Sequence, residues 1–454
     1  MALASRHLRN WLTTLALGLA SPISAAADLL DIWELAVQRD PIYAAARSAT
    51  TADSEWVNQA RAQLLPSLSA TAALSNQTQR QASNLSHHSN NNINQWSVVL
   101  RQPLIDLSAY QLYERSQHQA GMAVIAEEQA RQNLMLRVAE AYFDVLAEED
   151  NLRSLQAQRQ AIEHQLQAAQ HAFELGGTTI TDAHEAQARL DLLQANIVLA
   201  ENALEVQQQR IQRLIVQPAP DLNPLQQTQL PAPEPANINA WTTQASISNL
   251  EVLRSDLAVE ATRALLKANK REHSPTLSIQ ARSGSASNVG IYGPNSSPRA
   301  LDNSIGLELE IPLYSGGEIS SRVREQSSRL QQHQYERENA RRNAIEATQR
   351  YFSGVLSGLS QIQALAAAER SSQAALEANT LAYEVGVRIN IDVLNAQQQL
   401  YETQRALSKA RYDTLLNSLR LKEAAGNLSE EDLIALNQLL SAQAQPSPLT
   451  ESTE

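Results

Sequence analysis

Two stretches of the 454-residue sequence, FELGGTTITDAHEAQARL at 173–190 and YEVGVRINIDVLNAQQQL at 383–400, share one pattern that decides the fold. In each stretch a helical pattern stops at a glycine, Gly176 or Gly386, and resumes six residues later at an aspartate. Glycine adopts the backbone conformations that end a helix and reverse the chain at little steric cost. Each stretch therefore predicts a turn between an outgoing and a returning helix.

Other features of the chain are repeated at a nearly constant distance. Pro275 of the segment PTLS follows Pro66 of PSLS by 209 residues, and Tyr351 follows Tyr142 by the same distance. The two glycine turns lie 210 residues apart, which indicates a single-residue insertion in one copy. The chain is therefore predicted to be a tandem duplication of one structural repeat.

Composition and proline positions define the segments of the chain. Near the start, Arg6 and Arg9 precede the apolar run WLTTLALGLA and the small-residue segment SPISAAAD, which is the layout of a secretory signal peptide. Six prolines lie between the two repeats, a composition typical of an extended linker. We therefore expect a signal peptide at 1–27, a first repeat at 28–216, a proline-rich linker at 217–237, a second repeat at 238–441 and a mobile tail at 442–454.

Long stretches without proline indicate long helices in both repeats. The intervals 104–217 and 313–445 contain no proline. From position 183 to position 214, mostly apolar residues recur in alternating steps of three and four, and a matching stripe lies 210 residues further on. This heptad pattern is typical of a coiled coil. The predicted long helices cover about 110–175, 182–216, 317–385 and 391–425.

Four segments alternate between apolar and polar residues, which is the period of a β-strand. They lie at about 66–79, 94–106, 275–285 and 303–315. Alternation alone also fits a water-soluble, half-covered sheet, because each segment carries only a weak barrel signal. The long helices, however, already bury their apolar stripes against one another, and the chain is expected to be exported. Four strands cannot close a spanning barrel by themselves, so we expect several subunits to share one.

Charge and residue usage argue against nucleic-acid binding, metal binding and catalysis. The formal net charge is −12, and the few lysines form no basic stripe that could bind phosphates. The absence of cysteine excludes thiol catalysis, cysteine-bound zinc and disulfides. His87 and His88 lie in a polar loop, and Glu308 and Glu310 lie on one strand face, without a catalytic motif around them. We therefore expect no enzyme, no cofactor and no metal site.

The order of these features resembles the TolC family of outer-membrane efflux and secretion channels. The resemblance covers the whole mature chain. It rests on DLLDIWELAVQRDP at 28–41, the two P-[ST]-L-S strand starts, QPLID at 102–106, IPLYSGG at 311–317, both glycine turns and GNLSEEDLIALNQLL at 426–440. It implies a mixed α and β fold in which three copies build one 12-stranded barrel in the outer membrane of a Gram-negative bacterium. Long α-helical coiled coils would continue this barrel as a tunnel across the periplasm.

The resemblance also implies a function and partners. The protein would be the exit duct of a tripartite efflux pump or of a type I protein secretion system, opened when coiled coils untwist at the periplasmic tip. Its partners would be two further copies of itself, outer-membrane lipid, a periplasmic adaptor and an inner-membrane transporter of the ABC, RND or MFS type. The alternative is a periplasmic coiled-coil adaptor or scaffold without a pore, which would lack the four strands.

The family pattern, carried over residue by residue, places a gate at the glycine turns. The bonding network of this gate would consist of Gln165, Thr181, Asp182, Tyr383 and Arg388. Asp392 would form a ring of carboxylates at the closed entrance, and Asn395 stands where the family has a second, deeper aspartate. Thr380 stands where the family can carry a glutamate partner for Gln165. Contact with the adaptor would fall on Leu175, Gly176, Gly177, Val385, Gly386 and Val387.

Asp182 also has a purely structural interpretation. Together with Glu185 it fits a capping box that would start the returning helix. The sequence therefore predicts capping as one role of Asp182, and the resemblance adds gating as a second.

Overall fold

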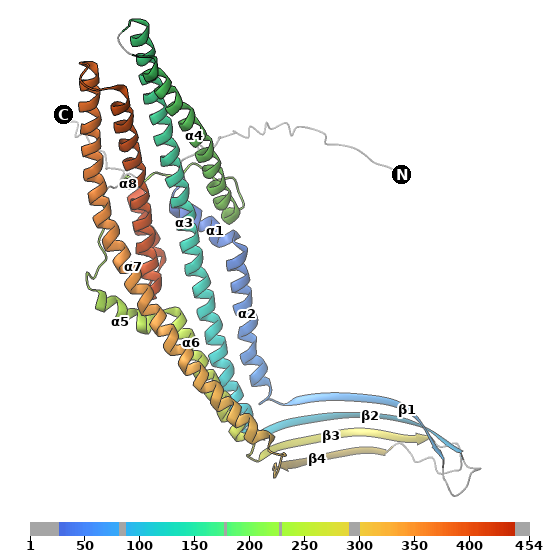
Figure 1. The fold of residues 1–454 in the computed structure, drawn as a ribbon. Helices are drawn as coiled ribbons and strands as arrows, with labels where there is room; N and C mark the ends of the chain where they lie inside the picture. Colours follow the sequence, from blue (N-terminus) through green and yellow to red (C-terminus); the bar gives the residue numbers. More distant parts are fainter. Residues whose placement is uncertain (1–26, 81–87, 177–178, 227–228, 290–299, 441–454) are drawn as a thin grey trace, which may run out of the picture.

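The computed structural model describes residues 27–80, 88–176, 179–226, 229–289 and 300–440. Both halves contain the same series of two helices, two strands and two long helices (Figure 1). The first half has α1 (Leu29–Arg39), α2 (Pro41–Ala62), β1 (Ser67–Arg80), β2 (His88–Ile105), α3 (Leu107–Glu174) and α4 (Ile180–Ile215). The second has α5 (Ile238–Ser248), α6 (Leu250–Arg271), β3 (Thr276–Val289), β4 (Ala300–Glu310), α7 (Glu318–Glu384) and α8 (Asn390–Ala425), followed by α9 (Glu430–Leu440). The predicted mixed α and β fold with an internal duplication is confirmed.

Three predicted features lie wholly or mostly outside the described residues. They are the signal peptide, of which only residue 27 is described, the tail at 442–454 and Gly177.

The strands differ most from their predicted bounds. β2 begins at His88 rather than near 94, because its backbone stays paired with β1 as far as the pair Arg80 and His88. Ladder hydrogen bonds join backbone groups, so this pairing needs no side-chain alternation. β4 ends at Glu310 rather than near 315, opposite Thr276, where β3 itself begins. The next residue but one is Pro312, which has no N–H to donate to a ladder.

The helices form an elongated body with the sheet at one end and the glycine turns at the other (Figure 1). α3 and α7 run along this body. Near the turns they pack against α4 and α8, and near the sheet they pack against α2 and α6. Within the described part of the chain, no helix combines the length and the apolar character that crossing a membrane requires.

The packed faces of the returning helices follow the predicted heptads. Ala183, Ala186, Leu193, Ile197 and Ala200 are buried in α4, and Val393, Leu400, Thr403, Leu407 and Ala410 are buried in α8. Small residues bring the helices close together, since a Cβ added to Gly358 of α7 would collide with Thr414 of α8. Each half of the chain therefore contains one tightly packed helical hairpin.

The sheet has one apolar face and two unpaired edges. Its strands are antiparallel in the order β1-β2-β3-β4, and the register aligns Leu68, Leu100, Ala281 and Ile305 in one row across all four. Leu68 and Ile305, at the two ends of this row, are 70% and 79% exposed, so no described part of the protomer covers these ends. Among the described residues, β1 and β4 each pair with only one neighbour. The sheet thus lacks both a partner for its apolar face and partners for its edges.

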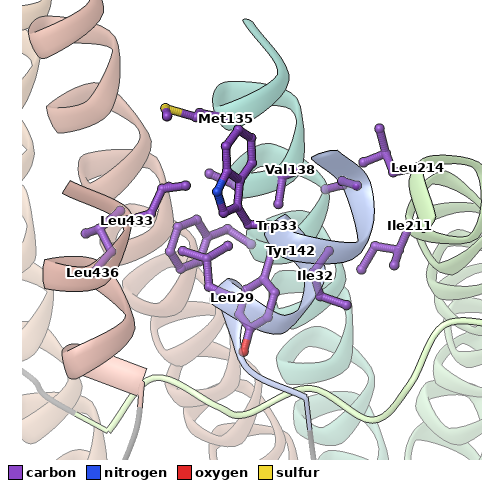
Figure 2. Packing of buried hydrophobic residues seen from close by; sticks show 14 of the residues in the cluster. Leu29, Ile32, Trp33, Met135, Val138, Tyr142, Ile211, Leu214, Leu433 and Leu436 are labelled. Atoms are coloured by element: carbon purple, nitrogen blue, oxygen red, sulfur yellow. The ribbon is translucent and has the colours of Figure 1, made fainter. Parts of the chain in front are cut away.

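The main core lies where α1, α3, α4, α8 and α9 meet. Figure 2 shows side chains from several of these elements gathered there, and the labelled residues are Leu29, Ile32, Trp33, Met135, Val138, Tyr142, Ile211, Leu214, Leu433 and Leu436. The Tyr142 hydroxyl donates a 2.9 Å hydrogen bond to the carbonyl of Asn223, which lies in the linker between the repeats. This core therefore joins the two halves of the chain.

A buried ion pair joins α2 to α3 near this core. The Asp40 carboxylate, 3% exposed, accepts hydrogen bonds of 2.9 and 3.0 Å from the two terminal nitrogens of Arg137. It also caps α2 by accepting the backbone N–H of Tyr43 at 2.8 Å. Burial works to raise the pKa of the Asp40 carboxyl, but the hydrogen bonds and charge of Arg137 and the N–H of Tyr43 outweigh burial and hold this pKa below its usual value.

Candidate gate at the helical tip

Each hairpin turns at a glycine in the left-handed region of backbone conformation. Gly176 follows α3 with a φ of +74°, and Gly386 follows α7 with a φ of +75°. Residues with a side chain adopt this conformation only with strain. Leu175, Val385 and Val387 beside these glycines are 88%, 66% and 76% exposed. Five of the six positions predicted to contact an adaptor therefore lie at the tip, and three of them present apolar side chains there.

The predicted capping box at the start of α4 is wrong. The helix begins at Ile180, and Thr179 is its N-cap without a side-chain hydrogen bond. Asp182 lies in the first turn, where its own N–H donates to the Thr179 carbonyl at 3.2 Å. A carboxylate in this turn is stabilised by the helix dipole rather than by capping geometry. With the helix starting two residues earlier than expected, Glu185 lies beyond the capping position.

Asn390, at the start of α8, joins three helices at one buried point. Its side-chain oxygen accepts a 2.6 Å hydrogen bond from the Gln165 amide of α3, and its amide donates at 3.1 Å to the Asp182 carbonyl of α4. Asn390 is completely buried. Two of the predicted gate residues are thus brought together by a residue that was not predicted. The sequence did contain a signal for Asn390, because this polar residue stands where the equivalent position of the first repeat has the apolar Ile180.

Among the described residues, Gln165 forms no hydrogen bond with Thr380. The Thr380 hydroxyl donates to the Leu376 carbonyl at 2.8 Å, inside α7. The Gln165 amide donates instead to the side-chain oxygen of Asn390, at 2.6 Å. The link that the sequence left open is therefore made to another residue, on α8.

The contacts of the remaining predicted gate residues within one chain are local. Arg388 lies 3.4 Å from the carboxylate of Asp392 in the same chain, and Thr181 is exposed. Burial raises the pKa of the Tyr383 phenol, and the negative charge of Asp182 raises it further. The phenol therefore keeps its proton and can donate a hydrogen bond. In the described part of the chain, no hydrogen bond joins Tyr383 to Asp182, and Arg388 forms its ion pair with Asp392 alone.

Asn395 is held by an arginine that the sequence did not single out. One terminal nitrogen of Arg189 on α4 donates to the Asn395 side-chain oxygen of α8 at 2.6 Å. The other donates to the side-chain oxygen of Gln398, whose amide donates to Glu402 at 2.7 Å. The tip thus has two polar bridges between α4 and α8, one through Asn390 and one through Arg189.

Solved structures define the class of protein to which this fold belongs. The CmeC outer membrane channel of Campylobacter jejuni aligns with a TM-score of 0.76 and 15% identity over 97% of this chain and 98% of that chain. CusC aligns with a TM-score of 0.77 and 16% identity over 88% of this chain and 92% of that chain. The fold is therefore that of an outer-membrane channel.

Sequence comparison identifies the family. The profile described as "Outer membrane efflux protein" matches residues 32–216 and 241–427, one match in each repeat. Outer membrane protein TolC of Escherichia coli is 30% identical over 437 residues, which cover 94% of this chain and 88% of that protein. The alkaline protease secretion protein AprF of Pseudomonas aeruginosa is 30% identical over 94% of this chain and 90% of that protein. The chain belongs to the outer membrane efflux protein family, which confirms the predicted TolC-like channel and its place in the outer membrane.

Proposed function

We propose that three copies of this chain form the exit duct of a tripartite efflux pump or type I secretion system in the outer membrane of a Gram-negative bacterium. The open sheet carries this proposal. Strands in a membrane must pair at every edge, and a closed barrel is the arrangement that achieves this. Three sheets joined edge to edge, β4 of one copy beside β1 of the next, give 12 strands. The row of Leu68, Leu100, Ala281 and Ile305 would then face the outer-membrane lipid.

The helical tip is the part that would meet the rest of the machinery. The exposed side chains of Leu175, Val385 and Val387 offer an apolar surface to a periplasmic adaptor, which in turn holds an ABC, RND or MFS-type transporter. The relatives include proteins named for protease secretion and for antibiotic efflux, so the same duct fits both kinds of system. The transporter would select the cargo, and the duct itself would carry out no catalysis.

Opening would separate the two hairpins at the tip. Among the described residues, the polar bridges that join the hairpin of the first repeat to that of the second there include Gln165 to Asn390 and Arg189 to Asn395. Tyr383 and Arg388 lie at the turn of the second hairpin, where their side chains can bond across to a neighbouring copy. Breaking such contacts would free α8 to untwist and widen the entrance, with Asp392 on its first turn.

The gate predicts a change in conductance when its turn residues are altered. Tyr383→Phe combined with Arg388→Ser should raise single-channel conductance in planar lipid bilayers several-fold, because both changes remove polar groups that would bond to a neighbouring copy in the closed tip. Tyr335→Phe with Arg342→Ser is a matched control. Arg342 forms the same kind of i,i+4 ion pair, with Glu338, on α7 but away from the tip. Equal conductance in wild type and the tip variant would contradict this gate.

The rival function, a periplasmic scaffold without a pore, makes a different prediction for the same protein. A scaffold would leave the membrane fraction on washing with carbonate, whereas a barrel protein requires detergent. It would also give no channels when added to a bilayer.

A further inference from the structure

Arg189 brings a positive charge to the tip without a negative partner. Its guanidinium donates to Asn395 and Gln398, and both acceptors are neutral amides. Glu185 lies one turn away on the same helix and Glu402 accepts a hydrogen bond from Gln398, yet neither forms an ion pair with Arg189 in the described part of the chain. Hydrogen bonds to amide oxygens orient a guanidinium but do not neutralise it.

The nearest predicted negative charge of the entrance is already compensated. Asp392 lies one helical turn before Asn395 on α8, and its carboxylate is 3.4 Å from Arg388. Asp392 is therefore ion-paired, whereas the guanidinium at Asn395 has no ion-pair partner among the described residues, and the nearest carboxylate along α8 in this bonding chain is Glu402, beyond Gln398. The Asn395 side chain is exposed while Val393 and Leu394 are buried, so the amide that Arg189 binds lies on the exposed face of α8, and Arg189 itself is half-buried.

We propose that Arg189 is a selectivity-determining residue, which forms a ring of guanidinium groups at the tunnel entrance and favours anions and carboxylate-bearing cargo. This inference rests on the proposed function, since three copies around one axis are needed to form the ring. Rings of arginine or lysine are the arrangement that favours anions in pores. A narrow passage with walls of low dielectric constant strengthens the field of such a ring. Asn395 stands where the family resemblance would place an aspartate, so the position has one negative charge fewer. Arg189 of α4 adds a positive charge at the same place.

The same guanidinium also joins α4 to α8 by hydrogen bonds, so the test must separate the effect of its charge from the effect of these bonds. Arg189→Gln removes the charge and the forked donor group. Arg189→Lys keeps the charge but not the fork, because an ammonium group cannot make two parallel bonds in a fixed plane. Asn395→Asp neutralises Arg189 while strengthening the bridge, since a carboxylate accepts from a guanidinium more strongly than an amide does.

The test measures the reversal potential of single channels in a potassium chloride gradient. The chloride-to-potassium permeability ratio should fall several-fold in Arg189→Gln and in Asn395→Asp, and stay near the wild-type value in Arg189→Lys. Conductance should separate these variants, rising in Arg189→Gln and falling in Asn395→Asp. Arg213→Gln, the same charge change in the last turn of α4, is the control and should leave the ratio unchanged.

Each outcome decides a separate claim. An unchanged permeability ratio in Arg189→Gln, in a protein that still forms channels, would overturn the role of Arg189 and leave the duct intact. A shift of equal size in Arg213→Gln would also overturn it, because the effect would then come from overall charge. If the wild-type protein forms no channels, the proposed function itself fails, and the inference fails with it.

Discussion

Replacing Arg137 with alanine is expected to lower the free energy of unfolding by about 3–5 kcal/mol. The reason is that Asp40, which is 3% exposed in the wild-type protein, would lose both of its guanidinium bonds and the positive charge beside it. A buried charge without a partner is far more costly than the pair itself is stabilising. Helical circular dichroism followed through urea or thermal unfolding in detergent measures the effect.

The matched control is Arg153→Ala on the same helix. Arg153 is 68% exposed and pairs with Asp150 within α3, so its removal should change stability by less than about 1 kcal/mol. Equal losses of stability in the two variants would show that the pair of Asp40 and Arg137 stabilises the fold no more than an exposed ion pair does.

The pH dependence of the Arg137→Ala defect gives a second readout. The pKa of Asp40 is lower in the folded protein than in the unfolded chain. The ionised carboxylate therefore contributes fully to folding stability at pH values above the pKa of the unfolded chain, and this contribution is lost as the pH falls through the pKa of the folded protein. Without Arg137, burial is left to raise that pKa, and the carboxyl can take up a proton. The stability difference between wild type and Arg137→Ala should therefore narrow in acid, below about pH 4. A difference that is constant from neutral to acid pH would contradict this account of the pair.

Replacing Asn390 with alanine is expected to open the tip. The change leaves the half-buried Gln165 amide without this acceptor and removes the side-chain bond to the Asp182 carbonyl. The two lost hydrogen bonds together contribute about 1–3 kcal/mol, and a closed state weakened by that amount shifts the balance toward the open state about 5- to 150-fold. The measurement is the mean conductance and open fraction of single channels in bilayers.

Two further variants show whether bonding or volume holds the tip. Asn390→Ile, which copies Ile180 of the first repeat, fills the space without making the bonds and should open the channel as alanine does. Gln187→Ala removes an exposed amide of α4 that donates a hydrogen bond to Asp191 on the same helix, and it should have no effect. Wild-type behaviour of Asn390→Ile would mean that packing, not hydrogen bonding, keeps the tip closed.

Much of the fold could be predicted because it is encoded locally. Heptad spacing depends only on neighbours within one helix, and the α4 seam from Ala183 to Ala200 is buried as the spacing indicates. Strand alternation likewise predicted which side chains share the apolar face of the sheet, including Leu68 and Ile305. The glycine turns could be predicted for the same reason, since a positive φ is a property of single residues such as Gly176.

The polar bridges of the tip could not be predicted in this way. Gln165 and Asn390 are 225 residues apart, and Arg189 and Asn395 are 206 apart. Their partners depend on how hairpins from different repeats are placed beside each other, which no local pattern encodes. The error at Asp182 has a related cause, because capping depends on the first residue of the helix, and helix ends shift by one or two residues without a change in periodicity.

The central claim is that an incomplete sheet is completed by two other copies of the same chain. Native mass spectrometry of protein extracted from membranes with mild detergent tests it most directly. The account predicts one species with the mass of three chains, which falls apart to single chains on heating in strong detergent. A stable single chain in detergent-free buffer, with its apolar sheet face covered by its own helices, would contradict it.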